Sequence, residues 1–213
     1  MYKSFSTEIK SMAVCDDILF DKKLRTGGFY ELAIQVCPSA DNEPVKQYIN
    51  YIWSLENVVG PFDVNKNSIT TDILNIQHIG ILNLGSYNIP FLTYNIREDE
   101  PVETGFNWFD ICFYTAAIEK VFGDEYKTWT ENPKVPIELE NFFLKTIREL
   151  YAIYPFQLAI LDFEVSGQYY LENLKTPLRH WMPSRFFVGK ENYEHIADSN
   201  RKYVTQVETL DLK

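Results

Sequence analysis

The chain has 213 residues, of which 46% are hydrophobic and 23% are charged, a composition typical of an ordinary folded protein, and its length fits a single domain over residues 1–213. Its 30 acidic residues against 20 basic residues give a formal net charge of −10, which argues against binding to nucleic acid or to an anionic membrane, because phosphate contacts need an excess of Lys and Arg. No apolar run reaches the roughly 18 residues of a membrane span, and the polar start lacks the apolar core of a secretory signal, so we expect a cytoplasmic protein.

The first part of the chain predicts two strands followed by a helix. We expect a short strand over residues 17–20 and a longer one over 26–36, which follows a Gly-Gly turn and alternates apolar with mixed side chains. Pro44 suits the first position of a helix, and Val45, Tyr48, Ile49 and Ile52 follow it at spacings of three and four residues. This spacing predicts an amphipathic helix.

The middle of the chain predicts a strand pair, a third strand and a short helix. Residues 73–98 are rich in β-branched and aromatic side chains around turn-forming residues at 85–88, which predicts two strands joined by a turn. A charged loop follows over 97–103. Residues 107–114 predict the next strand, and 115–123 predict a short helix that ends at a glycine.

The last part of the chain contains the clearest helix. Residues 137–154 carry a single apolar stripe, and Pro155 ends the helix that this stripe predicts. Residues 156–167 then predict a strand. Two further strands are expected over 185–189 and 202–210.

Three of the predicted strands share one arrangement, an apolar face backed by a mixed face that contains an acid. The acids are Glu31 in the first strand, Asp110 in the second, and Asp162 with Glu164 in the third. A sheet covered by helices on one side only shows this alternation. We therefore predict a single α+β domain with a mostly antiparallel or mixed sheet, about three helices packed on one face, and the other face partly open.

The open face is the predicted binding surface, because it combines acids with aromatic side chains. Its residues and those of the charged loop beside it are the candidate partner-binding set: Glu31, Glu98, Asp99, Glu100, Trp108, Asp110, Tyr114, Asp162 and Glu164. An alternative interpretation is structural: each acid near a strand end can simply emerge into solvent or pair with an arginine.

Signatures of known chemistry are absent from the sequence. The cysteines, Cys15, Cys37 and Cys112, form no CxxC pair, and the histidines, at 78, 180 and 195, have no zinc-binding spacing. No phosphate-binding glycine motif, nucleophile elbow or calcium loop occurs. We therefore expect no catalytic residue, no metal site and no cofactor.

In size and acidity the chain resembles bacterial immunity or antitoxin-type proteins, which cover a basic toxin domain. The leading hypothesis is a non-catalytic binding protein that engages a basic protein partner, such as a toxin or a nuclease. The first alternative is a carboxylate-dependent hydrolase or metal enzyme that uses Asp110, Asp162 and Glu164. The second is a structural subunit of a homo-oligomer, in which the mixed face forms the self-interface.

Overall fold

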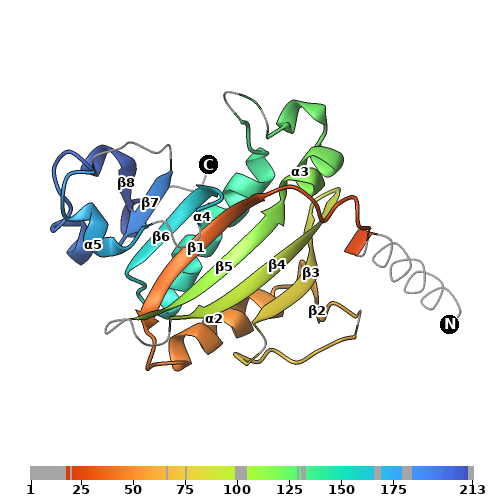
Figure 1. Ribbon diagram of the computed structural model, residues 1–213, viewed down its shortest axis with the longest axis horizontal. Helices are drawn as coiled ribbons and strands as arrows, with labels where there is room; N and C mark the ends of the chain where they lie inside the picture. The colour runs from red at the N-terminus through yellow and green to blue at the C-terminus, as the bar shows by residue number, and fades with distance from the viewer. Residues whose placement is uncertain are drawn as a thin grey trace, which may run out of the picture.

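Eight strands form one open sheet in the computed structural model (Figure 1). The structure describes residues 18–19, 21–65, 67–74, 76–98, 105–128, 130, 133–165, 169–178 and 184–210. The strands are β1 (Phe29–Pro38), β2 (Val58–Phe62), β3 (Gln77–Leu84), β4 (Tyr87–Arg97), β5 (Phe106–Tyr114), β6 (Leu158–Phe163), β7 (Arg185–Val188) and β8 (Val204–Gln206).

The sheet order is β2-β3-β4-β5-β1-β6-β7-β8. Every neighbouring pair is antiparallel except β7 and β8, which run parallel. The first long strand of the chain, β1, therefore lies near the centre, between β5 and β6. The protein is a single α+β domain with a mostly antiparallel mixed sheet, which confirms the predicted fold class.

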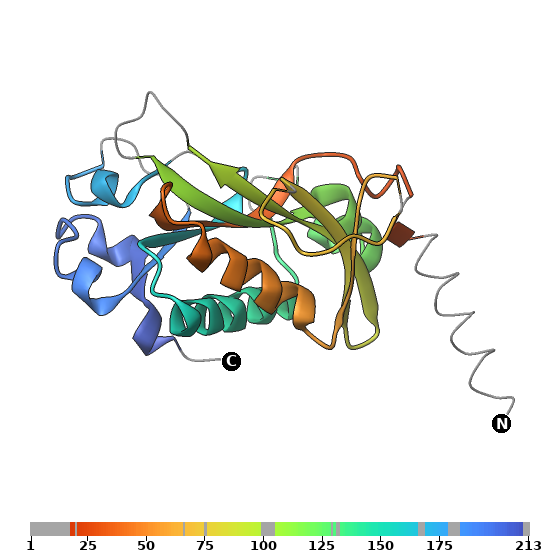
Figure 2. The same cartoon turned by 90° about the horizontal axis from the view of Figure 1, so that it is seen from below.

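Two long helices cover one face of the sheet. Figure 2 shows α2 (Glu43–Ser54) and α4 (Ile137–Ile153) side by side beneath the strands. A third helix, α3 (Thr115–Phe122), directly follows β5 and contacts β4. The shorter helices are α5 (Leu171–Leu174), α6 (Lys190–Tyr193) and three 3-10 turns, Asp124–Tyr126, Arg201–Tyr203 and Val207–Thr209.

The largest core lies between the sheet and the two long helices, α2 and α4. Tyr30, Phe113 and Phe143 are fully buried there, and the ring of Phe143 lies 5.5 Å from each of the other two rings. Edge-on aromatic packing of this kind adds to the free energy gained from the buried area. The apolar stripe predicted for residues 137–154 is thus the face of α4 that meets the sheet.

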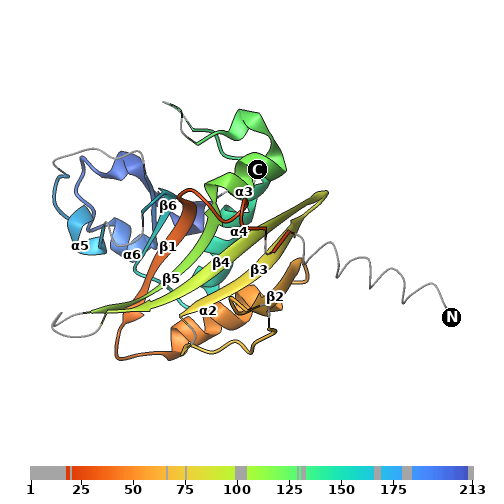
Figure 3. The same ribbon diagram turned by 45° about the vertical axis from the view of Figure 1, so that its right-hand side comes forward.

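On the opposite face of the sheet, apolar clusters of the described residues cover the two ends. At the β6 end, Leu171 and Leu174 of α5 pack against Trp108 and Leu158. At the β3 end, Leu19 packs against strand residues of β3, β4 and β5. Figure 3 shows α5 and α6 gathered beside β6, with the strands between the two ends left in view.

Several elements differ from the sequence prediction: α5 and α6 were not predicted, and the strand expected over 202–210 is the shorter β8 with a 3-10 turn on each side. The strand expected over residues 17–20 is wrong in its described part, because residues 18–19 are helical; positions 17 and 20 lie outside the described residues. The edge strand β2 was not predicted. It contains Gly60 and Pro61, and these two residue types interrupt the alternation from which a strand is predicted.

The described ranges contain no helix that is both long enough and apolar enough to span a membrane.

Candidate functional site

The strand order brings the predicted acids together. The three strands that carry them, β5, β1 and β6, are neighbours in the sheet. Glu31 lies opposite Cys112 of β5 and opposite Asp162 of β6, and Asp110 lies opposite Ala33 of β1. Residues directly opposite each other in an antiparallel pair share a face, with Cβ atoms about 4.5–5.5 Å apart. The acids therefore lie on the face that α2 and α4 leave uncovered.

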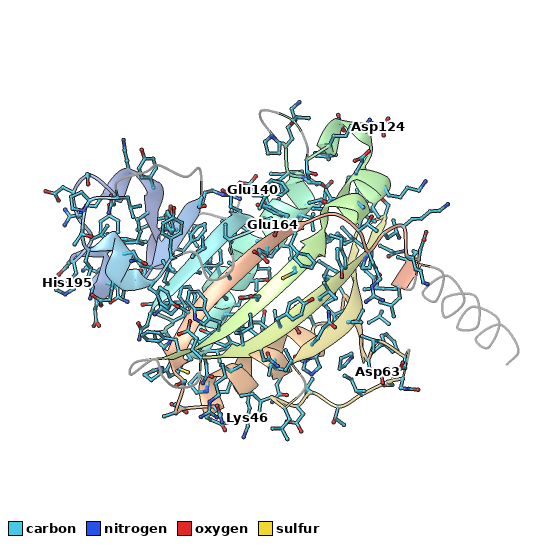
Figure 4. All side chains as sticks on the ribbon, viewed as in Figure 1. Lys46, Asp63, Asp124, Glu140, Glu164 and His195 are labelled. Carbon is cyan, nitrogen blue, oxygen red and sulfur yellow. The ribbon has the colours of Figure 1, made fainter. Side chains whose placement is uncertain are left out.

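The uncovered face contains a hollow of about 240 Å³ that we call the acidic hollow. Figure 4 labels one of the residues of this hollow, Glu164, which follows the end of β6 beside the start of β1. Its lining consists of Phe29, Glu31, Tyr94, Ile96, Asp110 and Glu164. Three carboxylates and two aromatic rings thus surround one small concave site.

Glu31 forms the floor of the acidic hollow and is only 3% exposed. One carboxylate oxygen accepts a hydrogen bond of 2.6 Å from the backbone N–H of Val165, and the other accepts one of 3.3 Å from the thiol of Cys112. A buried carboxylate needs partners of this kind to offset the loss of hydration. Glu31 therefore also holds the chain in place where it leaves β6.

Glu164 lies at the rim of the acidic hollow and is exposed. Its Oε1 accepts a 2.6 Å hydrogen bond from the backbone N–H of Phe29, while its own N–H donates to the carbonyl oxygen of Phe29. Its φ of 54° is unusual for a residue other than glycine, asparagine or aspartate. A side chain at Gly28 would clash with this carboxylate, so glycine at that position lets Glu164 reach β1.

The thiol of Cys112 is held in its neutral form. Burial raises its pKa well above the ordinary value, and the nearby charges of Asp110 and Glu31 raise it further. The thiolate, and not the thiol, is the reactive nucleophile. Cys112 therefore acts in this site as a hydrogen-bond donor to Glu31.

Aromatic rings form the apolar wall of the acidic hollow. The ring of Phe29 lies 4.7 Å from that of Tyr114 and 6.3 Å from that of Tyr94. Burial raises the pKa of Tyr94 to about 12, and its hydroxyl accepts a hydrogen bond from Gln77. Tyr94 therefore stays neutral at physiological pH. Ile96, 41% exposed, adds an accessible apolar contact at the rim.

Trp108 and Glu98, predicted as surface contacts, have internal roles. Trp108 is only 3% exposed, and its indole N–H donates to Glu98 over 3.0 Å. The same carboxylate accepts hydrogen bonds from the hydroxyl of Tyr170 and from the backbone N–H of Phe106. Glu98 thus joins β4, β5 and the segment before α5, and Trp108 lies beneath that segment.

The other predicted site residues differ in accessibility. Asp110, like Glu31 and Trp108, is buried, which corrects the expectation that these side chains line a wet face. Tyr114 and Asp162 are half-buried. Asp162 lies beside Glu31 but outside the lining of the hollow, and its carboxylate accepts from the N–H of Phe163.

Asp99 and Glu100 of the charged loop lie outside the described residues.

The contribution of β4 to this site was not predicted. Tyr94 lies opposite Asp110, and Ile96 lies opposite Trp108. The period-two alternation of β4 places both side chains on one face, and that signal is present in the sequence. The sequence does not show, however, which strands lie beside β4, so it could not place these two side chains next to Asp110 and Trp108.

No group of three His, Cys, Asp or Glu side chains within the described ranges is arranged to hold a metal ion.

Comparisons of the chain with protein-family models, with curated proteins and with solved structures gave no match.

Proposed function

We propose that the protein is a non-catalytic binding protein whose acidic hollow and its surroundings engage a basic protein partner. The observation that carries this proposal is the hollow itself, in which Glu31, Asp110 and Glu164 meet beside exposed and half-buried apolar side chains. Charged groups in a concave site with apolar walls focus the electrostatic potential. A Lys or Arg side chain of a partner would enter a site of this kind favourably.

Accessible residues and buried residues have different roles in this proposal. Glu164, Ile96 and the half-buried Asp162 would contact the partner directly. Glu31 and Asp110 would act through their negative potential at the floor of the hollow. The net charge of −10 adds long-range attraction that speeds association with a basic protein.

The most concrete form of the proposal is a cytoplasmic immunity or antitoxin-type protein that neutralises a toxin domain. A nuclease is the toxin class that fits the charge best, because the active site of a nuclease must attract phosphates and is therefore basic. The protein would block such a site by presenting carboxylates in place of phosphates.

A carboxylate-dependent hydrolase is the second candidate, because three acids do converge in a concave site. Two features weigh against it. First, Glu31 and Glu164 already accept hydrogen bonds from backbone N–H groups. Second, Asp162, one of the acids predicted for a hydrolase site, does not line the hollow. A general acid or base needs a free path to its substrate.

Affinity capture with two charge-reversal variants tests the proposal. The purified protein would be incubated with extract of its native source, washed at low and then at high salt, and the bound proteins identified by mass. We expect a basic protein that is retained at low salt, released at high salt, and lost when Asp162→Lys replaces the wild type.

Asp198→Lys is the matched control, because it changes the net charge by the same amount. Asp198 is 92% exposed and pairs with Arg201, at 3.1 Å. Asp198 comes three residues after His195 in the chain, and Figure 4 shows His195 far from Glu164. If both variants lose the partner equally, net charge and not the sheet face determines capture. If the wild type retains no basic protein, the proposal is wrong.

A further inference from the structure

A pocket larger than the acidic hollow lies on the opposite side of the sheet. It has a volume of about 480 Å³ and runs along α4, between that helix, the end of α2 and the turn of the β3–β4 hairpin. Figure 2 shows this hairpin reaching past the layer of α2 and α4. We call it the hairpin groove. Its volume falls within the roughly 300–1,000 Å³ of small-molecule sites.

The hairpin groove has an apolar floor. Leu55 comes from the end of α2, Leu84 from the end of β3, and Phe142 from α4. Tyr87 closes one side and is itself held by Phe122 of α3, with ring centres 4.5 Å apart. Four separate elements thus fix the shape of the groove, and an apolar ligand body would displace water from a preformed surface.

The polar groups of the groove offer an unused hydrogen-bond acceptor. The side-chain oxygen of Asn141 is buried and has no hydrogen-bond partner within the described part of the chain. A buried acceptor without a donor costs free energy, and most such groups in folded proteins are satisfied. This oxygen has almost no accessible surface, so the Asn141 side chain must turn towards the groove before it can accept a hydrogen bond from an N–H donor of a ligand.

The charges of the groove favour a cation over an anion. Lys145 is paired with Glu149 at 3.8 Å, and Tyr51 donates its hydroxyl to the same carboxylate. Glu138, half-buried at the start of α4, forms no ion pair with the described part of the chain. The lining therefore carries two acids against one base, and the base is already neutralised by its neighbour.

We propose that the hairpin groove binds a small organic amine, with its ammonium group between Glu138 and the side-chain oxygen of Asn141 and its apolar body on Leu55, Leu84 and Phe142. The proposal is independent of the acidic hollow, which lies on the other face of the sheet. It therefore stands or falls separately from the proposed function.

A set of three probes of one shape tests the ligand class. We would titrate the full chain with 2-phenylethylamine, phenylacetate and 2-phenylethanol, which are respectively cationic, anionic and neutral, and follow backbone amide signals by NMR. The amine should shift the signals of Gly85, Ser86 and Lys145 to saturation. The other two probes should bind at least about tenfold more weakly, because neither can donate a hydrogen bond from a charged ammonium group.

Two substitutions at one position test the site. Asn141→Leu removes the acceptor and should weaken amine binding about tenfold, whereas Asn141→Asp keeps the shape, adds a charge and should strengthen it. Because the two variants are expected to act in opposite directions, a general loss of structure cannot imitate the result.

Several outcomes would overturn the proposal. They are the absence of any shift with the amine, equal or tighter binding of phenylacetate, shifts confined to residues of the acidic hollow, and amine binding that neither variant changes.

Discussion

Two fully buried polar side chains, Glu31 and His78, differ in how their hydrogen-bonding groups are satisfied. Both oxygens of Glu31 accept hydrogen bonds, whereas neither ring nitrogen of His78 has a partner among the described residues. His78 packs against the indole ring of Trp53, with ring centres 5.9 Å apart. Removal of the side chain is therefore expected to destabilise the protein at Glu31 and to cost little stability at His78.

Replacing Glu31 by leucine should destabilise the protein by about 1–3 kcal/mol, because the backbone N–H of Val165 would lose its acceptor in a buried position. Glu31→Gln keeps an acceptor oxygen and should cost less. Urea denaturation measures both. Glu172→Leu is the control for the loss of a surface acid, since that side chain is 73% exposed. Equal stability of Glu31→Leu and Glu172→Leu would show that the bond to Val165 contributes nothing.

His78 should make the protein less stable in mild acid. Burial lowers its pKa below the ordinary 6.5, although the charge of Asp72 acts in the opposite direction. Below pH 6.5 the unfolded chain then binds a proton that the folded chain does not, so stability falls as the pH drops from 6.5 towards the lowered value. Each unit of pKa difference is worth about 1.4 kcal/mol.

Denaturation curves between about pH 7.5 and about pH 5 measure this dependence. His78→Leu should flatten the curve of stability against pH and should cost little at the upper end, because it removes nitrogens that have no partner. His195→Leu, at an exposed position, should leave the slope as in the wild type. An unchanged slope in His78→Leu would contradict the prediction.

At the scale of elements, one carboxylate joins the segment before α5 to the sheet. Glu98 accepts hydrogen bonds from Trp108, from Tyr170 and from the backbone of β5. Its hydrogen bond to the hydroxyl is the main cause that raises the pKa of Tyr170. Gln35 adds a second attachment, since its side-chain oxygen accepts from the N–H of Leu171.

Glu98→Ala should release this segment from the sheet without unfolding the whole domain. Hydrogen exchange of the Leu171 amide should accelerate about tenfold or more, because bonds to a charged acceptor contribute about 1.5–3 kcal/mol. Tyr170→Phe removes one of the three donors and should have a smaller effect. Glu172→Ala, within α5 itself, is the control, and an acceleration equal to that of Glu98→Ala would contradict the assigned role.

The elements that were predicted well are those in which local pattern and packing agree. The helix expected over 137–154 is α4, and the strand expected over 107–114 is β5, because each presents one continuous apolar face to the core. The edge strand β2 and the short helices α5 and α6 were missed. Their few residues give no periodicity, and tertiary contacts alone stabilise them.

At the scale of the whole molecule, the strand order determines which of the predicted side chains lie together. The alternation in three strands predicted acids on one face, and the position of β1 between β5 and β6 brings those acids together. The sequence could not predict that Trp108 would be buried, because its cover comes from residues distant in the chain, and Asp110 is buried as well. Nor could it predict that Ile96 would remain accessible beside them.

The central claim is that the acidic hollow itself contacts a basic partner, and one comparison tests it most directly. The affinity of the captured partner would be measured for Ile96→Lys and for Leu74→Lys. Both side chains are exposed and apolar, at 41% and 83%, and both changes add one positive charge, but only Ile96 lines the hollow. We predict that Ile96→Lys weakens binding about tenfold or more, while Leu74→Lys leaves it within about twofold. Equal affinities of the two variants would contradict the claim.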